Sequence, residues 1–403
     1  MNYRYRYLII GGGLAGASAI AGIRQQDKEG TIGLLCAETI LPYHRPPLSK
    51  DLLWGKKTFP EIFVFDEKYY ADQKVTVHLR TRAKSIHPVK CFAADEAGNE
   101  YYYSKLLIAT GGNPRQFSQA GEAVHYFRNA RDYEILMQAV PRVKDFLIVG
   151  GGFIGAELAA GLIHLDRKVM MLFTGKGLLD HIFPADLSAS VTDFYKQKGV
   201  YFFTEDEPAG FESKNDRVKV TTKGGKKLET GWVIAGIGID PEAELAQSAG
   251  LQIDKGIVVD KNLRTSRPGI YAAGDLARFP CEALGQAMRL EHWDNAGAQG
   301  KCAGINMAGG SEPYGYLPYF YSDLFEMGFE AVGLLDAKMK TVSAWEIPFR
   351  KGVVVYLEDD QVKGVLLWQQ TKMLDWARKL ILDKAAVKSA EDLKVLIPAG
   401  LAV

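Results

Sequence analysis

Two glycine-rich segments are the first residues in the chain whose types and spacing predict chemistry. Residues 11–16 and 150–155 both read G-x-G-x-x-G, and each follows a short apolar run and precedes an alanine-rich stretch with helical spacing. This order predicts a strand, a tight turn and a helix, in which the glycines let the backbone approach a pyrophosphate and the helix N-terminus faces its negative charge. One such motif is weak evidence, but two in one chain indicate two dinucleotide sites and electron transfer between them.

An acidic residue follows the first motif where a Rossmann unit places the carboxylate that binds a ribose. Glu38 lies 22 positions after Gly16, at the end of an apolar run, so we favour the ribose role over a solvated loop glutamate. After the second motif, Phe173 stands where such an acid is usual, and Lys176 follows in the same loop. We expect NADH as the nicotinamide donor and leave NADPH open, because no acid in this loop would repel a 2′-phosphate.

The composition is that of an ordinary globular chain. The chain has 403 residues, which is long enough for two or three domains. Of these residues, 47% are apolar and 24% are charged. A net charge of +1 provides no general attraction to nucleic acid or to a membrane surface. No apolar run is long enough to cross a bilayer, and the apolar stretch near Met1 is interpreted as a strand rather than a signal peptide, so we expect a cytoplasmic protein.

The cysteines give no sign of redox or metal chemistry. Cys36, Cys91, Cys281 and Cys302 are far apart and form no C-x-x-C pair, so sequence neighbours cannot make a dithiol or a zinc site. We interpret them as small buried residues and expect no metal.

Residues 41–50, which read L-P-Y-H-R-P-P-L-S-K, resemble a segment of the FAD-dependent pyridine-nucleotide reductases. The most similar branch contains the ferredoxin and rubredoxin reductase-like flavoproteins and apoptosis-inducing factor. The resemblance implies that Arg45 contacts the FAD pyrophosphate and that Lys50 lies beside the flavin ring, where a cation stabilises the negative charge of the reduced ring. We expect a helix to begin at Leu48.

Four further segments resemble the same family. Residues 105–115 resemble its A-T-G-x-x-P-R crossover, and residues 232–241 resemble its return segment G-x-G-x-x-P. Within residues 265–275, a match to the second FAD signature, the resemblance places Gly274 close to the cofactor and Asp275 at a ribityl hydroxyl. Residues 289–296 open a helix that runs to residue 307 and points its N-terminus at the flavin. Trp293 is then expected to pack at the ring, with a plain core position as the alternative.

The resemblance also implies contacts between distant parts of the chain. Glu157 corresponds to a glutamate that pairs with the lysine at the flavin, so we expect a Lys50–Glu157 ion pair across two domains. Phe153 corresponds to an aromatic residue over the flavin face where nicotinamide enters. Tyr321 replaces the tryptophan of the family's F-W-S-D segment and keeps a flat ring for stacking on flavin or nicotinamide. Apoptosis-inducing factor carries an acid where this chain has Gly175.

The motifs and the resemblance together imply three sets of site residues. Residues expected near the reacting rings are Lys50, Phe153, Glu157, Trp293 and Tyr321. FAD contacts are expected at Gly11, Gly13, Leu14, Ala15, Gly16, Glu38, Arg45, Lys50, Ala83, Ala109, Thr110, Gly111, Arg115, Gly274, Asp275, Glu291, His292 and Trp293. NAD(P) contacts are expected at Gly150, Gly152, Phe153, Ile154, Gly155, Phe173, Lys176, Gly236 and Gly238.

The predicted fold class is α/β, with two Rossmann-like nucleotide-binding domains of three-layer ββα type and an α+β C-terminal domain. The FAD domain is expected to be discontinuous, with residues 1–113 and 244–312 on either side of an NAD(P)H domain at 114–243. Residues 313–403 form the C-terminal domain, a candidate interface for a homodimer if the protein is not a monomer. Within it, residues 352–357 and 362–368 are predicted strands, and residues 377–381 belong to a predicted helix.

This organisation predicts hydride transfer from NAD(P)H to flavin N5, followed by electron transfer to an external acceptor. A small iron–sulfur protein of the ferredoxin or rubredoxin type is the first candidate acceptor, and a quinone is another. The alternative is a redox-sensing binding protein like apoptosis-inducing factor, in which NADH forms a long-lived charge-transfer complex with little turnover. A thiol branch of the superfamily carries a cysteine where this chain has Thr39, so we expect no redox-active disulfide. We expect no nucleic-acid partner.

Overall fold

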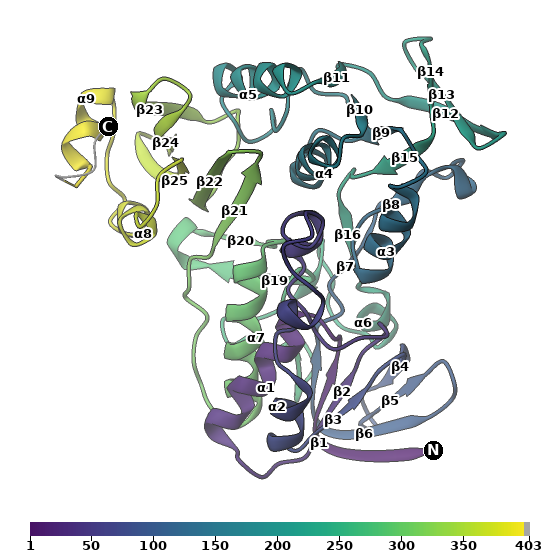
Figure 1. The fold of residues 1–403 in the computed structure, drawn as a ribbon. Helices are drawn as coiled ribbons and strands as arrows, with labels where there is room; N and C mark the ends of the chain where they lie inside the picture. The colour runs from purple at the N-terminus through teal and green to yellow at the C-terminus, as the bar shows by residue number, and fades with distance from the viewer. Residues whose placement is uncertain (399–403) are drawn as a thin grey trace. The chain divides into compact units, whose positions relative to one another are not determined.

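The structure is a computed structural model that describes residues 1–398, and it divides into two compact units (Figure 1). The first unit contains residues 1–45, 58–113 and 240–318. The second contains residues 46–57, 114–239 and the chain from Tyr319 onward. Residues 46–57, which the sequence placed in the FAD domain, therefore belong to the second unit. The remaining boundaries of the three predicted domains stay a prediction.

The first unit is built on a sheet with the strand order β3-β2-β1-β6-β5-β4, in which β18 also pairs with β6. Strands β1, β2, β3, β6 and β18 are parallel, and β4, β5 and β6 are antiparallel neighbours. The elements of this unit are β1 (Asn2–Ile10), α1 (Leu14–Gln26), β2 (Ile32–Leu35), η2 (Pro60–Ile62), α2 (Glu67–Asp72), β3 (Val75–His78), β4 (Ala83–His87), β5 (Phe92–Asp95), β6 (Glu100–Ile108), α6 (Glu244–Ser248), β17 (Ile257–Val258), β18 (Ile270–Ala272), β19 (Ala277–Cys281), η4 (Glu282–Leu284), β20 (Gln286–Met288) and α7 (Trp293–Met307). The chain passes between the units at β7 (Gly112–Pro114) and β16 (Ile239–Pro241).

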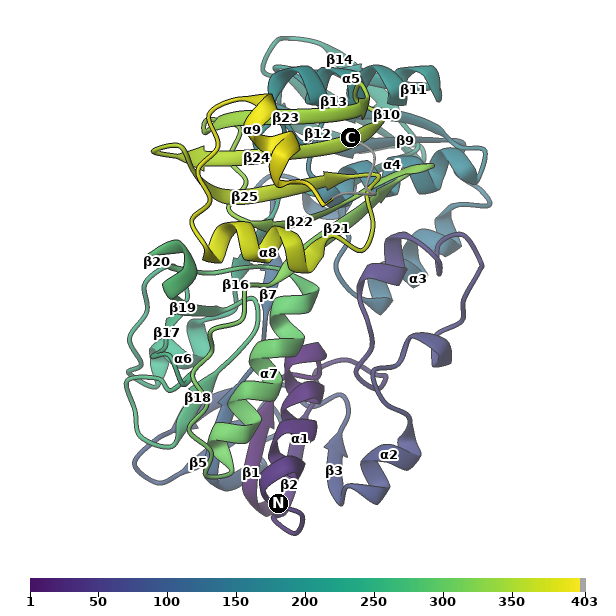
Figure 2. The ribbon, with the colours of Figure 1, turned by 90° about the vertical axis from the view of Figure 1, so that its left-hand side faces the viewer.

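Helices α1 and α7 lie side by side in both views (Figure 1; Figure 2). They approach closely because glycines stand at their contact. A Cβ at Gly300 would collide with the Ala15 carbonyl, and a Cβ at Gly304 would collide with the Ala19 carbonyl. The predicted helix that ends at Met307 is confirmed as α7. This packing brings the N-terminal and C-terminal parts of the first unit together.

The second unit contains a parallel sheet with the strand order β11-β10-β9-β15-β8 and two antiparallel sheets. The smaller antiparallel sheet has the order β12-β13-β14, and the larger has the order β21-β22-β25-β24-β23. The elements are η1 (Pro46–Ser49), η3 (Gly121–Ala123), β8 (His125–Tyr126), α3 (Ala130–Ala139), β9 (Asp145–Val149), α4 (Phe153–His164), β10 (Lys168–Leu172), α5 (Ala185–Gln197), β11 (Val200–Phe203), β12 (Pro208–Lys214), β13 (Arg217–Thr222), β14 (Lys227–Thr230), β15 (Trp232–Ala235), β21 (Tyr319–Leu324), β22 (Met327–Gly333), β23 (Lys340–Ile347), β24 (Lys351–Glu358), β25 (Gln361–Trp368), α8 (Leu374–Leu382) and α9 (Ala390–Leu396).

The C-terminal part of this unit follows the sequence prediction. The two predicted strands are confirmed as β24 and β25, and the predicted helix lies within α8. Figure 2 shows α8 alongside the five-stranded sheet, where it packs on β22 and β25. Both strand–turn–helix units are also present, as β1–α1 in the first unit and β9–α4 in the second. The predicted α/β fold class is therefore confirmed.

The helix expected to begin at Leu48 does not form as an α-helix. Its place is taken by the short 3₁₀ helix η1, which is followed by turns as far as residue 55. The two prolines at its start lack N–H donors, and the Pro47 carbonyl accepts two later N–H groups at 3.1 and 2.9 Å instead of starting a regular ladder. The segment packs on α4, where the Leu53 side chain occupies the space left by Gly161. These contacts explain why it belongs to the second unit.

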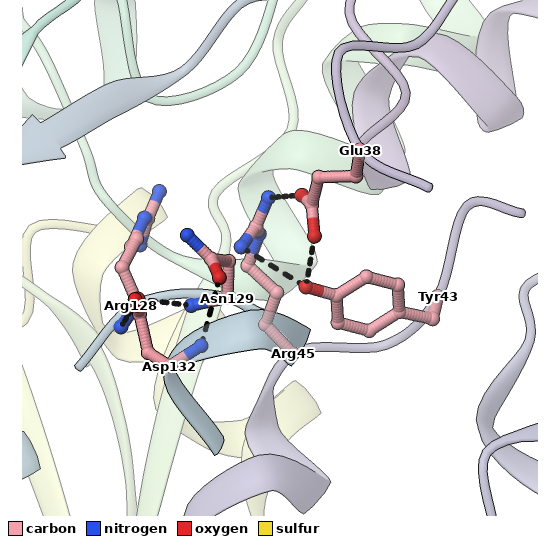
Figure 3. Close-up of polar contacts among 6 residues, drawn as sticks. All are labelled: Glu38, Tyr43, Arg45, Arg128, Asn129 and Asp132. Atoms are coloured by element: carbon pink, nitrogen blue, oxygen red, sulfur yellow. Dashed lines mark hydrogen bonds and ion pairs between the residues drawn. The ribbon is translucent and has the colours of Figure 1, made fainter. Parts of the chain in front are cut away.

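Some helices begin at local signals in the sequence. At the start of α3, the Asn129 side chain accepts a hydrogen bond from the Asp132 N–H at 3.1 Å (Figure 3). The Asp132 carboxylate in turn accepts hydrogen bonds from the N–H groups of Arg128 and Asn129 at 2.8 and 3.0 Å. Across residues 1–398, no helix combines the length and the apolar character that a membrane crossing requires.

Candidate functional site

The first glycine turn joins β1 to α1 and has the space and charge that a pyrophosphate needs. Gly11 has φ +124°, and a Cβ there would collide with the Ala109 carbonyl, so only glycine fits. A Cβ at Gly13 would meet nothing within 4 Å. Helix α1 begins after Gly13 without a side-chain cap from that residue and without an acid in its first turn, so its first N–H groups lack these acceptors in the described chain. The residues Leu14, Ala15 and Gly16 form this first turn, which fits an anion.

The second predicted FAD segment lies beside the same turn. A Cβ at Gly274 would stand 3.1 Å from the Ala15 Cβ and 3.8 Å from the Ala296 Cβ, so Gly274 lies between α1 and α7. Its N–H donates to Gln299 Oε1 at 2.9 Å. Gln299 is fully buried, and its Nε2 has no hydrogen-bond partner within residues 1–398. Two signatures far apart in sequence therefore meet at one place, next to a buried polar group.

Glu38, Tyr43 and Arg45 form one polar cluster after β2 (Figure 3). Tyr43 Oη donates to Glu38 Oε2 at 2.7 Å, and Arg45 Nη2 donates to Glu38 Oε1 at 2.7 Å. Burial alone would lower the pKa of Arg45, but Tyr43 and Glu38 outweigh it and the pKa is raised. The sequence assigned Glu38 and Arg45 to different parts of FAD, and the structure brings the two side chains together as an ion pair.

Trp293 lies at the start of α7 and is 37% exposed, so it is not a plain core residue. Its Nε1 donates to His44 Nδ1 at 2.9 Å. The preceding residue, His292, has its pKa lowered to about 4 by burial, against the opposing charge of Asp275. His292 is therefore neutral near pH 7. The sequence also placed Glu291 at FAD. Its Oε1 forms an ion pair with Arg289 Nη1 at 2.8 Å.

The chain near β6 supplies the remaining predicted FAD residues of the first unit. The Ala109 N–H donates to the Ile10 carbonyl at 2.8 Å, which holds this segment against the first glycine turn. Both neighbouring residues bond to the main chain of Glu242. Thr110 Oγ1 donates to the Glu242 carbonyl at 2.9 Å, and the Gly111 carbonyl accepts the Glu242 N–H at 2.9 Å. Ala83 begins β4 at the far edge of the same sheet. Arg115, in contrast, belongs to the second unit.

The second glycine turn joins β9 to α4 and repeats the geometry of the first. Gly150 has φ +121°, and a Cβ there would collide with the Gly236 carbonyl. Gly152 again faces open space, and α4 begins after it without a side-chain cap from that residue or an acid in its first turn, within the described part of the chain. Ile154 is 37% exposed in the first turn of α4, which also contains Gly155. The turn fits a second pyrophosphate.

The end of β15 lies next to this turn. The Gly236 N–H donates to the Val149 carbonyl at 2.8 Å, which places the return segment beside the strand before the glycines. Gly238 has φ +94°, and its carbonyl accepts the Arg115 N–H at 3.0 Å. The residues that the sequence assigned to NAD(P) from these two segments are therefore neighbours in the second unit.

A buried charge cluster surrounds Lys50 in the second unit. Lys50 Nζ lies 3.3 Å from Glu157 Oε1 and 3.2 Å from Asp323 Oδ2. The Glu157 carboxylate also accepts hydrogen bonds from Ser49 Oγ at 2.5 Å and from Ser322 Oγ at 2.6 Å. The predicted Lys50–Glu157 ion pair is present, but both partners lie in one compact unit instead of two domains.

The surroundings of Lys50 hold its positive charge in place. Burial opposes the charge, but Glu157, Tyr321 and Asp323 outweigh it, so the pKa of Lys50 is raised above its usual value. Its ammonium stands 3.9 Å from the centroid of the Tyr321 ring, a distance typical of a cation–π contact. Sequence reasoning did not assign roles to Ser49, Ser322 or Asp323. They could have been found because they stand next to Lys50 and Tyr321 in the two segments that resemble the family.

Phe153 and Phe173 both follow the second glycine turn in sequence, at the start of α4 and after β10, and have different surroundings. Phe153 packs edge-on against Phe320 with ring centroids 5.7 Å apart. Phe173 is buried, and its ring fills the space beside Gly151. Lys176 is exposed in the loop that follows, and its N–H donates to Asp180 Oδ2 at 2.8 Å. Phe173 is thus part of the packing under the turn.

All four cysteines lie in the described part of the chain and are free thiols. Cys36, Cys281 and Cys302 are buried as expected, but Cys91 is exposed, so the interpretation as a buried residue is wrong for Cys91. Burial, assisted by the charge of Glu38, raises the pKa of Cys36 to about 12, so its thiol is protonated near pH 7.

The family is shown by comparison with known proteins. Residues 5–300 match the family described as pyridine nucleotide-disulphide oxidoreductase, and residues 303–348 match the C-terminal domain of mitochondrion-associated apoptosis-inducing factor. The chain belongs to the pyridine nucleotide-disulphide oxidoreductase family. Members of this family bind FAD and use NAD(H). Within that family it falls in the branch of ferredoxin reductases and apoptosis-inducing factor, which confirms the predicted resemblance.

Individual relatives match nearly the whole chain. Putidaredoxin reductase CamA of Pseudomonas putida is 32% identical, over 96% of this chain and 94% of the relative. Apoptosis-inducing factor 1 of Dictyostelium discoideum is 33% identical, over 97% of this chain and 81% of the relative. Among solved structures, the covalent putidaredoxin reductase–putidaredoxin complex matches with a TM-score of 0.91 and 30% identity, over 98% of this chain and 96% of that chain. The ferredoxin reductase for the CYP199A2 system of Rhodopseudomonas palustris has a TM-score of 0.89 at 29% identity, over 95% of this chain and 96% of that chain.

Proposed function

We propose that the protein is an FAD-dependent NAD(P)H oxidoreductase that passes electrons to a small iron–sulfur protein of the ferredoxin or rubredoxin type. The observation that carries this proposal is the repetition of one built turn. Gly13 and Gly152 both face open space at the start of an uncapped helix, in the described chain. Each turn fits one pyrophosphate, so the chain fits two dinucleotides. When bound, FAD and NAD(H) would supply hydride transfer between nicotinamide and flavin.

Most of the residues that would hold FAD belong to the first unit. The N–H groups at the start of α1 would face its pyrophosphate, and Arg45 would add a charged donor there. Gly274 and Asp275 would lie along the ribityl chain, and α7 would direct its N-terminus at the ring. The remaining first-unit residues named above and Arg115, in the second unit, are proposed as FAD contacts on the resemblance alone.

Lys50 would supply a fixed positive charge at the flavin ring. Its ammonium stays protonated because Glu157 and Asp323 pair with it, and Glu157 in turn is held by two serine hydroxyls. A charge fixed in this way favours the anionic form of the reduced ring without further rearrangement. We propose that Phe153, Trp293 and Tyr321 line the same rings.

The acceptor is proposed from the relatives' names. Putidaredoxin reductase and the ferredoxin reductase subunit of a 5,5′-dehydrodivanillate O-demethylase from a Sphingobium strain, which is 34% identical, are both named for electron transfer of this kind. A rubredoxin-NAD(+) reductase of Pseudomonas putida is 32% identical. A quinone acceptor remains the other proposal within the same class. We propose that the reaction takes place in the cytoplasm. We propose that the protein acts as a monomer or as a homodimer formed through its C-terminal part.

A second candidate function is favoured by one observation, the match of residues 303–348 to the C-terminal domain of apoptosis-inducing factor. Under this alternative the protein binds NADH for a long time and changes its assembly instead of turning over. The full-length similarity to reductases makes it the weaker proposal.

One experiment separates the two functions. The purified flavoprotein is reduced anaerobically with NADH and, in parallel, with NADPH, and reoxidation by a ferredoxin, a rubredoxin, a quinone and oxygen is followed. Sedimentation velocity is measured before and after reduction. Rapid reoxidation by an iron–sulfur protein without a change in assembly supports the reductase. Slow reoxidation by every acceptor, together with a new dimer, supports the sensor instead.

A further inference from the structure

The two glycine turns are followed by the same set of backbone hydrogen bonds. The Gly11 N–H donates to the Leu35 carbonyl, and the Gly150 N–H donates to the Leu172 carbonyl, both at 2.9 Å. Leu35 ends β2 and Leu172 ends β10. Counting onward from these two residues therefore identifies equivalent positions in the two nucleotide-binding halves.

The equivalence continues into the next loop. The Glu38 carbonyl accepts the Arg80 N–H at 3.0 Å, and the Gly175 carbonyl accepts the Glu205 N–H at 3.0 Å. Arg80 and Glu205 also share a left-handed backbone, with φ +53° and +54°. Gly175, and not Phe173, is therefore the counterpart of Glu38. The position from which the second half would extend a ribose-binding carboxylate has no side chain.

Another residue fills the space of the missing side chain. A Cβ at Gly175 would stand closer than 3.0 Å to both carboxylate oxygens of Asp180. Gly175 does not have the left-handed φ that favours glycine, so the glycine is needed there for space. The carboxylate of Asp180 thus lies where a side chain of residue 175 would begin.

The loop holds Asp180 in this position. The Lys176 N–H donates to Asp180 Oδ2 at 2.8 Å, and Oδ1 has no hydrogen-bond partner within residues 1–398. The N–H of the preceding residue, Leu179, donates to the Gly151 carbonyl at 2.9 Å, which ties this part of the loop to the glycine turn itself. Asp180 is partly exposed, so solvent reaches this residue.

We propose that Asp180 supplies the carboxylate that binds the adenosine ribose of the nicotinamide dinucleotide, in place of an acid at position 175, and that it makes the protein selective for NADH. This inference rests on the proposed nucleotide site at the second glycine turn. A carboxylate accepts hydrogen bonds from the ribose hydroxyls and repels a 2′-phosphate. Glu205, exposed at the neighbouring loop, adds a second negative charge, whereas Lys176 acts in the opposite direction.

The test measures binding without redox chemistry. ADP-ribose and 2′-phospho-ADP-ribose are titrated calorimetrically into the oxidised, flavin-loaded protein. We expect wild type to bind ADP-ribose at least roughly tenfold more tightly than its 2′-phosphorylated form, since a hydrogen bond to a charged group and a like-charge contact each contribute on that scale. Asp180→Ala should lose roughly tenfold in ADP-ribose affinity and most of the discrimination. Asp180→Asn keeps the shape and should lose discrimination more than affinity. Asp193→Asn, an exposed carboxylate on α5 that pairs with Lys196, is the matched control.

A compensating pair sharpens the test. Gly175→Glu alone should weaken ADP-ribose binding, because the new side chain collides with Asp180. Gly175→Glu combined with Asp180→Gly returns the acid to position 175 and should recover binding. The inference is overturned if Asp180→Ala and Asp180→Asn bind both fragments as wild type does, or if wild type prefers the 2′-phosphorylated fragment. Failure of wild type to bind either fragment would instead contradict the proposed nucleotide site.

Discussion

Lys50 Nζ lies 3.3 Å from Glu157 Oε1, and both side chains are at least nine-tenths buried. Burying two charges is costly unless the pair is well placed and its remaining hydrogen-bonding atoms are satisfied. Ser49 and Ser322 meet that requirement for the carboxylate, and Asp323 meets it for the ammonium. The cluster joins η1, α4 and β21, which are far apart in sequence, so it contributes both to the packing of the second unit and to its proposed chemistry.

Removal of Glu157 should destabilise the protein strongly. Among the described residues, Glu157→Ala leaves the buried Lys50 with the half-exposed Asp323 as its remaining carboxylate partner, and we expect the free energy of unfolding to fall by about 3–5 kcal/mol. Asp323→Ala removes a carboxylate that is 48% exposed and should cost less than about 1 kcal/mol. Urea denaturation of both variants checks this order, and equal losses would contradict it.

Removal of Lys50 should slow flavin reduction. Lys50→Ala should retain FAD, since the proposed pyrophosphate contacts lie elsewhere, but reduction by NADH should slow by at least about tenfold, equivalent to one pKa unit of charge stabilisation. Stopped-flow loss of the flavin absorbance measures the rate after FAD content has been matched. Lys56→Ala, an exposed lysine of the same segment, is the control. A rate unchanged from wild type would contradict the proposed position of Lys50 beside the flavin ring.

The pH dependence of stability should carry a contribution from His292. Its pKa is lowered to about 4 in the folded protein by burial, against an unfolded value of about 6.5. The unfolded chain therefore binds this proton first as the pH falls, so stability is highest above about pH 6.5 and declines between there and about pH 4. Thermal unfolding across this range should show a smaller decline for His292→Gln than for wild type. Parallel curves for the two proteins would contradict the assignment.

Two glycines of α7 should respond oppositely to the same substitution. Gly300→Ala places a Cβ against the Ala15 carbonyl and should lower stability by about 1–3 kcal/mol. At Gly297 the nearest atom to a new Cβ is 3.5 Å away, an ordinary contact. Gly297→Ala should therefore raise stability by up to about 1 kcal/mol, since alanine is the better helix former. Chemical denaturation of both variants measures the difference. Two similar changes would show that the helix contact is not tight.

The sequence alone predicts the parts of this protein that depend on local patterns. The strand–turn–helix units at Gly11 and Gly150 could be predicted because spacing, neighbouring apolar runs and glycine chemistry all agree. The helix expected at Leu48 was wrong because two prolines and packing against Gly161 of α4 decide the local backbone.

Contacts between separate segments could not be derived from local patterns. The Lys50–Glu157 pair was expected only through the family resemblance. Asp323 pairs with Lys50 because β21 lies beside α4, and this contact between distant segments has no local pattern in the sequence. Asp180 was missed for a different reason, because a loop returns its carboxylate to the space beside Gly175, five positions earlier. No periodicity in the sequence encodes that return.

If one chain binds two dinucleotides and moves electrons between them, an anaerobic titration of the purified protein with NADH will show it in the flavin absorbance recorded against added equivalents. We expect one FAD per chain and complete loss of the oxidised flavin spectrum at one equivalent of NADH. A protein that binds no flavin on reconstitution, or bound flavin that NADH and NADPH both leave oxidised, would contradict it.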